Sequence, residues 1–221
     1  MARTSLGSAA ESLVVGDVAA VDITGQQLTQ HCWVRVTNFS GNRMFMGKYS
    51  SGQLQYLMYG NTAAKLVCSI GDGTTVDTAT STGSISTGVW QSVGMTKNGN
   101  SLIGYLNGTA DGSSAGTKSM INTTAPFLMA DHGFNDAQLF GGIAECAVWD
   151  IGLTAAEMAA LAKGFSPLLI RPTSLVAYWP ILGNNDPEPD LINNNPADVQ
   201  GTFTKIEHPR VIMPRAAIYV P

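Results

Sequence analysis

Residues 88–108, GVWQSVGMTKNGNSLIGYLNG, constrain the fold of this chain more than any other stretch. Apolar and polar residues alternate over 90–97 and again over 101–107, and the turn-forming sequence Asn-Gly-Asn separates these two segments. This pattern is typical of a β-hairpin with one buried face and one face closer to water. The residues that the alternation places on the buried face are Val93, Met95, Leu102, Gly104 and Leu106.

Short strands at intervals of roughly ten residues are predicted along most of the chain, which favours a sandwich or barrel over β-α-β units. They cover residues 28–37, 43–49, 53–59, 63–70, 126–130, 138–150, 174–182 and 199–206. In the first of them, Cys32 and Val34 fall on one face, whereas His31, Trp33 and Arg35 fall on the other. The chain is therefore expected to be all-β.

The hairpin resembles the central signature of the LamG-like, concanavalin A-like jelly-roll family: a Trp, a Val-x-Met-Thr-Lys strand, an Asx-Gly turn and Leu-x-x-Tyr-Leu-Asn-Gly. Residues 140–150 followed by 153–161 are similar to the core strand and short helix of that family, and residues 1–8 to its closing strand. The resemblance implies a two-sheet antiparallel jelly-roll β-sandwich with one short helix. All the matching motifs concern packing, and none is catalytic.

The predicted organisation is a LamG-like sandwich over residues 1–183, followed by a strand and an extended apolar tail over 184–221. One helix is predicted at 154–163, where Thr154 can cap the first turn and Glu157 completes a capping box. Met158, Leu161 and Phe165 form its apolar stripe. The tail is expected to pack either on its own sandwich or on a neighbouring subunit. Its predicted oligomer contacts are Val211, Ile212, Met213, Ile218, Tyr219 and Val220.

Composition argues against several functional classes. The net charge is −4 and no run of Lys or Arg occurs, so no nucleic-acid partner is expected. No apolar run has membrane-spanning length, and the amino-terminal residues lack the apolar region of a signal peptide. The three cysteines, Cys32, Cys68 and Cys146, are odd in number and widely spaced, so we expect reduced, buried thiols and synthesis in a cytoplasm.

A catalytic role is not expected. Related glucanases carry paired carboxylates on alternate positions of one strand. Here Glu145 and Asp150 are five positions apart, so an undistorted strand directs them to opposite faces. The histidines, including His31, His132 and His208, lie beside no Gly-x-Ser-x-Gly sequence that would present a nucleophile.

Two kinds of ligand site are predicted from the resemblance. LamG-like domains often hold calcium through loop oxygens, and the acidic loop residues here are Asp72, Asp131 and Asp136. The alternative is that these side chains only cap turns. Glycan binding on such a fold uses aromatic platforms, for which the predicted residues are Trp33, Tyr56, Tyr59 and Tyr105. The alternative there is that strand-borne aromatic residues pack within or across the sheets.

A single LamG-like domain with these traits resembles bacteriophage virion proteins. We therefore predict a non-enzymatic capsid decoration or fibre protein, assembled in a bacterial host cytoplasm, with binding of a cell-surface glycan. The expected partners are two further copies in a homotrimer and virion proteins such as the major capsid protein. The alternatives are a carbohydrate-binding module or adhesin domain of a bacterial surface protein and, behind both, a glucanase-like hydrolase.

Overall fold

The computed structural model describes residues 1–7, 11–50, 52–131 and 137–214. Within these ranges the chain forms strands, one α-helix and two single-turn 3-10 helices. In chain order they are β1 (Ala2–Leu6), β2 (Ser12–Gly16), η1 (Ala19–Val21), β3 (Gln27–Val36), β4 (Arg43–Ser50), β5 (Gln53–Gly60), β6 (Leu66–Gly71), β7 (Val76–Thr80), β8 (Gln91–Asn98), β9 (Ser101–Leu106), β10 (Thr109–Ala115), β11 (Phe127–Met129), β12 (Phe140–Trp149), α1 (Ala155–Ala162), η2 (Pro167–Leu169), β13 (Leu175–Trp179), β14 (Asp198–Gln200) and β15 (Thr204–Ile206).

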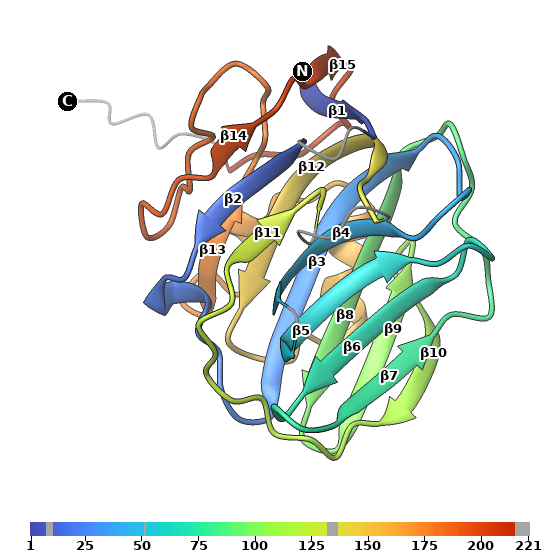
Figure 1. The fold of residues 1–221 in the computed structure, drawn as a ribbon, viewed down its shortest axis with the longest axis vertical. Helices are drawn as coiled ribbons and strands as arrows, with labels where there is room; N and C mark the ends of the chain where they lie inside the picture. Colours follow the sequence, from blue (N-terminus) through green and yellow to red (C-terminus); the bar gives the residue numbers. More distant parts are fainter. Residues whose placement is uncertain (8–10, 51, 132–136, 215–221) are drawn as a thin grey trace.

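The strands form two antiparallel sheets that pack face to face (Figure 1). The eight-stranded sheet has the order β10-β9-β8-β3-β12-β1-β15, with β13 also paired to β12. The seven-stranded sheet has the order β14-β2-β11-β4-β5-β6-β7 and lies in front in Figure 1. The predicted all-β, two-sheet antiparallel sandwich with one short helix is confirmed.

The main core lies between the two sheets and follows from the alternation in the sequence. On β3, Cys32 and Val34 are fully buried in it, while Trp33 lies on the outer face. On the β8–β9 hairpin, Val93 and Met95 are likewise fully buried in the core. The three cysteines are buried and free, as expected.

A second, smaller core covers part of the outer face of the eight-stranded sheet. It forms where α1 and the segment after it pack on β12 and β9, and it contains Tyr105, Ala147, Trp149, Leu153, Met158, Leu161, Ile170, Leu175 and Tyr178. The predicted capping box is present, since the side chains of Thr154 and Glu157 each accept from the other's backbone N–H. Phe165, the third residue of the predicted stripe, is 38% exposed.

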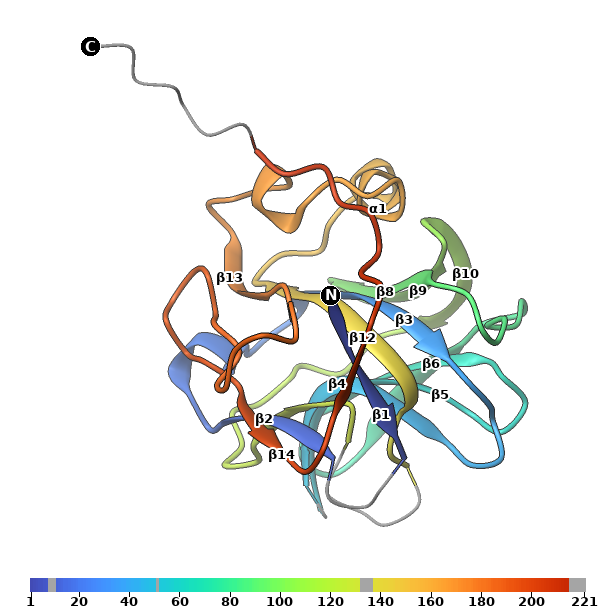
Figure 2. The same cartoon turned by 90° about the horizontal axis from the view of Figure 1, so that it is seen from above.

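The C-terminal segment differs from the single strand predicted over 199–206. It forms two short strands in different sheets, because β14 pairs with β2 and β15 pairs with β1. Gly201 lies between them with a φ of 74°, which turns the chain from one sheet edge to the other. Beyond β15 the segment crosses the sandwich toward α1 (Figure 2). The domain boundary at residue 183 stays a prediction.

Candidate functional site: a groove on the seven-stranded sheet

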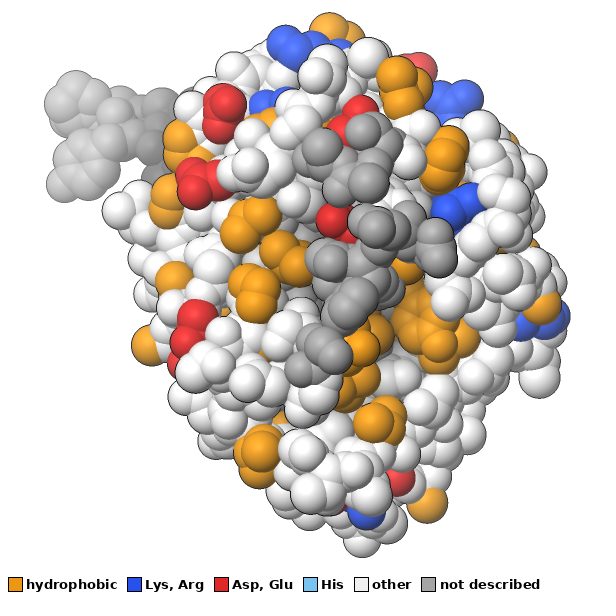
Figure 3. All heavy atoms as spheres, viewed as in Figure 1, with side chains coloured by type: hydrophobic (Ala, Val, Ile, Leu, Met, Phe, Trp, Pro, Cys, Tyr) orange, Lys and Arg blue, Asp and Glu red, His pale blue; other side chains and the backbone are white. Residues whose placement is uncertain are grey.

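Among the described residues, no helix or further layer of strands covers the outer face of the seven-stranded sheet over β4, β5 and β6. In Figure 3, hydrophobic side chains gather around the middle of this face and most charged side chains lie toward its edges. Tyr56 and Met58 of β5 point into the core, so Leu57 and Tyr59 point outward. Leu57 lies opposite Ser69 of β6 and beside Gly47 of β4, where an added Cβ would come within 2.6 Å of the Tyr56 carbonyl oxygen, so only glycine allows the two strands to approach this closely. 

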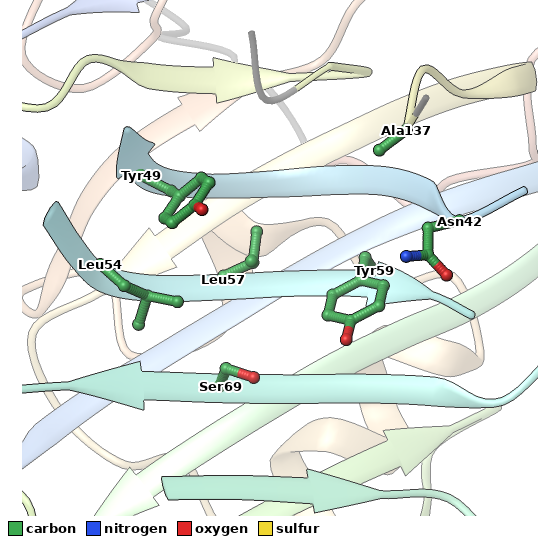
Figure 4. A pocket seen from close by; sticks show the side chains of 7 residues that line it. All are labelled: Asn42, Tyr49, Leu54, Leu57, Tyr59, Ser69 and Ala137. Carbon is green, nitrogen blue, oxygen red and sulfur yellow. The ribbon is translucent and has the colours of Figure 1, made fainter. Parts of the chain in front are cut away.

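These side chains line a hollow of about 210 Å3 (Figure 4). The residues around it are Asn42, Tyr49, Leu54, Leu57, Tyr59, Ser69 and Ala137. Tyr49 and Leu54 also line a second hollow of about 320 Å3, which continues to Gln53 and to the β6–β7 turn at 73–76. The two hollows together form one depression, which we call the tyrosine groove.

The tyrosine groove is electrically neutral. Among the described residues that line it, none is Lys, Arg, His, Asp or Glu. Burial raises the pKa of Tyr59, and the nearby Cys68 adds to this effect, so the phenol stays protonated. Ser69 Oγ lies 3.1 Å from Thr78 Oγ1, and Gln53 Oε1 accepts from the Thr124 hydroxyl at 3.1 Å. The walls therefore offer aromatic rings, aliphatic carbon and neutral hydrogen-bonding groups.

The structure separates the four aromatic residues predicted as a glycan platform. Tyr59 lies in the tyrosine groove, and Trp33 is partly exposed on the opposite face of the molecule. Tyr56 is fully buried, and its hydroxyl donates to the Val21 carbonyl at 2.5 Å. Tyr105 is 4% exposed within the second core. Neither of these two rings can offer a face to a ligand, which corrects the prediction for Tyr56 and Tyr105.

The predicted calcium residues do not form a cluster in the described part of the chain. Asp72 Oδ1 accepts from the backbone N–H groups of Thr74 at 3.0 Å and Thr75 at 2.8 Å. These bonds hold the pKa of Asp72 well below its usual range and identify it as a turn cap. Asp131 is buried after β11, and Asp136 lies outside the described residues. 

In residues 1–7, 11–50, 52–131 and 137–214, no three His, Cys, Asp or Glu side chains lie together in a way that could hold a metal ion. Calcium binding therefore stays a prediction. Calorimetric titration of the protein with calcium, after treatment with a chelator, measures it directly.

The carboxylates considered for hydrolysis are not brought together. Glu145 is 2% exposed on the outer side of β12, where Tyr178 donates to its Oε2 at 2.6 Å and His208 Nε2 lies 3.4 Å from its Oε1. Asp150 is exposed just after the strand ends. Burial raises the pKa of Glu145 to about 7, whereas the Tyr178 bond and the His208 charge act in the opposite direction.

The described part of the apolar tail packs on its own subunit. The backbone of Ile212 donates to the Gly164 carbonyl at 2.6 Å and accepts from Ser166 at 3.0 Å. The side chains of Ile212 and Met213 are nevertheless 51% and 49% exposed, while Val211 is half-buried. The remaining predicted contacts, Ile218, Tyr219 and Val220, lie outside the described residues. Contact of the tail with a second copy stays a prediction.

Sequence reasoning missed most of the groove, including Asn42, Tyr49, Leu57 and Ser69. The signal available was a tyrosine on each of two consecutive predicted strands, at Tyr49 and Tyr59. The alternation of side chains along the strands did not reveal the other residues of the groove, because the register of β4 and β5 shifts beside Tyr49.

Comparison with known proteins agrees with this architecture. The family model described as the concanavalin A-like lectin/glucanases superfamily matches residues 10–159. The chain belongs to this superfamily. The jelly-roll resemblance found in the sequence is thereby confirmed. Among curated protein sequences, none matches the chain.

Solved structures of this fold match at low sequence identity. A protein of Bacteroides ovatus, described as a candidate carbohydrate binding protein, has a TM-score of 0.73 at 16% identity over 96% of this chain. The chain spans 60% of the length of that protein. A heptameric SAP-like pentraxin of Limulus polyphemus has a TM-score of 0.54 at 16% identity, with 69% of this chain and 75% of the pentraxin covered.

A third similar structure is domain 4 of an extracellular arabinanase of Geobacillus stearothermophilus, solved in complex with arabinotriose. Its TM-score is 0.52 at 16% identity, with 63% of this chain and 68% of the domain covered. At this identity the three similarities concern the fold alone.

Proposed function

We propose that this protein is a carbohydrate-binding protein that holds a neutral oligosaccharide along the tyrosine groove. The observation that carries the proposal is that Tyr49 and Tyr59 line one hollow on the outer sheet face and that its described lining has no charged side chain. Membership of a superfamily of lectins and glucanases supports it. The arabinanase domain of the same fold, solved with arabinotriose, supports it as well.

Sugar binding fits the chemistry of the groove. The C–H face of a pyranose or furanose ring is apolar and packs on an aromatic ring, while its hydroxyl groups need neutral donors and acceptors. Asn42, Ser69 and Gln53 supply such groups around the two phenols. Because Tyr49 and Leu54 line both hollows, the proposed ligand is an oligosaccharide that occupies the two together. Binding without hydrolysis is proposed, since Glu145 and Asp150 do not line it.

The test is binding of arabinotriose, cellotriose and laminaritriose, measured by isothermal titration calorimetry. We expect at least one of them to bind, and we expect Tyr59→Ala to weaken it at least tenfold because the stacking surface is lost. Tyr59→Phe keeps the ring and should retain most of the affinity. Phe165→Ala is the matched control, since it removes an exposed ring from the opposite side of the sandwich.

Circular dichroism establishes that each variant is folded. The proposal is abandoned if none of the three sugars binds, or if Tyr59→Ala and Tyr49→Ala both bind as tightly as the parent. Chromatography of the incubated trisaccharides tests the absence of hydrolysis, because any shortened product would reveal an enzyme.

A second candidate function is assembly into a homotrimer of a bacteriophage virion, formed in the bacterial cytoplasm in contact with proteins such as the major capsid protein. The observation that favours it is the exposure of four large apolar side chains on and beside the C-terminal segment, namely Phe165, Leu169, Ile212 and Met213. Light scattering tests it. A trimer that becomes monomeric in Ile212→Ser/Met213→Ser supports the assembly role, and a monomeric parent protein contradicts it.

A further inference from the structure

The molecule carries a second depression, on the outer face of the eight-stranded sheet. The cover formed by α1 ends at Gly164, and beyond it Trp33 of β3 and Trp90, just before β8, form the floor of a groove of about 330 Å3. Residues 207–210 of the C-terminal segment also line it and are called its wall below. We call this depression the tryptophan groove. It lies across the sandwich from the tyrosine groove.

The floor of the tryptophan groove is fixed by the fold. Trp90 Nε1 donates to the Glu207 carbonyl at 2.9 Å, which ties the indole to the C-terminal segment. Its six-membered ring rests on Gly142 of β12, where an added Cβ would come within 2.8 Å of the ring. Trp33 of β3 lies between its two cross-strand partners, Ser92 of β8 and Ala144 of β12. Both indoles remain partly exposed.

The wall formed by the C-terminal segment is held at both ends. His208 Nε2 lies 3.0 Å from the Pro180 carbonyl, and Ile212 donates to the Gly164 carbonyl at 2.6 Å. Gly164 has a φ of 87°, and an added Cβ there would come within 2.6 Å of the Arg210 carbonyl. A glycine at this position therefore both ends α1 and lets the segment approach. These contacts hold the C-terminal segment in place, so the tryptophan groove is already formed in this structure.

The charge of the tryptophan groove is opposite to that of the whole chain. Lys163 and Arg210 line it, both exposed, and neither has an ion pair with any residue in the described ranges. Glu207 is the one acidic side chain among its described lining residues. A separate hollow on the same sheet is lined by Arg35 together with Thr4, Thr37 and Thr87. The tryptophan groove therefore combines two positively charged side chains with two indole rings, whereas the described lining of the tyrosine groove has no charged side chain.

We propose that the tryptophan groove binds an acidic oligosaccharide that contains uronic acid. A sugar ring packs on the indoles of Trp33 and Trp90, and its carboxylate pairs with Arg210 and Lys163. Arg offers a planar pair of N–H donors that matches the two oxygens of a carboxylate. Glu207 accepts from sugar hydroxyl groups, and it disfavours ligands of high charge density such as polyphosphates. This site is independent of the tyrosine groove.

The probe is trigalacturonic acid, and its methyl ester is the matched neutral control because esterification removes the charge and keeps the rings. Binding is measured by quenching of tryptophan fluorescence and by calorimetry. We expect the acid to bind at least tenfold more tightly than the ester. We also expect its affinity to fall as salt rises from 50 to about 500 mM, because the contacts are solvent-exposed charge pairs.

Variants locate the site. Arg210→Gln and Trp90→Phe are each expected to weaken binding of the acid, with Arg210→Gln costing at least tenfold. Lys118→Gln, which removes one positive charge that is paired with Asp72 and does not line the tryptophan groove, should leave it unchanged. Tyr59→Ala should also leave it unchanged, so failure of this proposal and failure of neutral-sugar binding are read separately. Arg210 is exposed, so its replacement is not expected to unfold the chain.

Three results would overturn the proposal. The first is that trigalacturonic acid does not bind, and the second is that acid and ester bind equally. The third is that inorganic tripolyphosphate competes at the same concentration as the acid, which would mark a site for anions in general.

Discussion

Replacement of Glu145 by Gln should change how the stability of the protein depends on pH. Glu145 lies in β12 at a register shift relative to β3, with a φ of 55°, and its carboxyl group is buried against Tyr178 and His208. Burial raises its pKa from 4.5 to about 7. In the unfolded chain the Glu145 carboxyl group has its ordinary pKa. Between pH 4.5 and about pH 7 the folded state therefore binds the proton more strongly than the unfolded state.

The sign and size follow from linkage. A raised carboxyl pKa means that the folded chain loses stability as the pH rises from 4.5 to about 7, and that the loss is complete above this range. Each pH unit between the two pKa values corresponds to about 1.36 kcal/mol, so the full loss is at most about 3 kcal/mol. The positive charge of His208 and the Tyr178 hydrogen bond oppose the effect of burial on Glu145, and we expect about 1–3 kcal/mol. Glu145→Gln removes this loss and keeps an acceptor for the Tyr178 hydroxyl.

The assay is urea unfolding followed by tryptophan fluorescence, for parent and variant, from pH 4.5 to pH 8. We expect the variant to gain stability over the parent by about 1–3 kcal/mol across this range. Burial also lowers the pKa of His31 to about 3, which makes the stability of both proteins rise with pH. The difference in stability between variant and parent removes this shared contribution. Asp150→Asn is the control for the loss of one carboxylate at the surface. A difference that stays constant with pH would refute the reasoning.

Two further predictions concern the scaffold. The ammonium group of Lys48 is fully buried and lies 2.5 Å from Asp17 Oδ1 and 2.6 Å from Asp22 Oδ1, so Lys48→Met should cost about 2–3 kcal/mol in urea unfolding. A loss below about 0.5 kcal/mol would mean that water replaces the ammonium group freely. Thr154→Ala should cost about 1 kcal/mol through loss of the helix cap, whereas Thr154→Ser should cost little. Equal losses in both variants would show that the methyl group, and not the hydroxyl, matters.

Local sequence patterns were sufficient for the elements and for the main core. The alternation around Cys32 and Val34 predicts which face of β3 is buried, because successive side chains of a strand point to opposite sides. The Thr154 and Glu157 pair predicts the start of α1, because a capping box is a contact between residues three apart in the chain. The family resemblance was carried by the same hairpin and strand. All these features depend on neighbours in sequence.

The sites depend on tertiary structure. The alternation of inward and outward side chains breaks down wherever a strand is distorted. Both Glu145 and Tyr49 lie at register shifts between neighbouring strands. An extra residue in one strand turns the following side chains to the other face, so no spacing rule could place Leu54 in the tyrosine groove.

The tryptophan groove depends on distant segments. Trp33 could be assigned to an outer face from sequence, but its neighbours Trp90, Lys163 and Arg210 come from three other parts of the chain. What sequence by itself determined is therefore the sandwich and the alternation that fills it. What only the folded structure decided is which outward side chains meet, because the strand order and the path of the C-terminal segment bring together residues far apart in the chain.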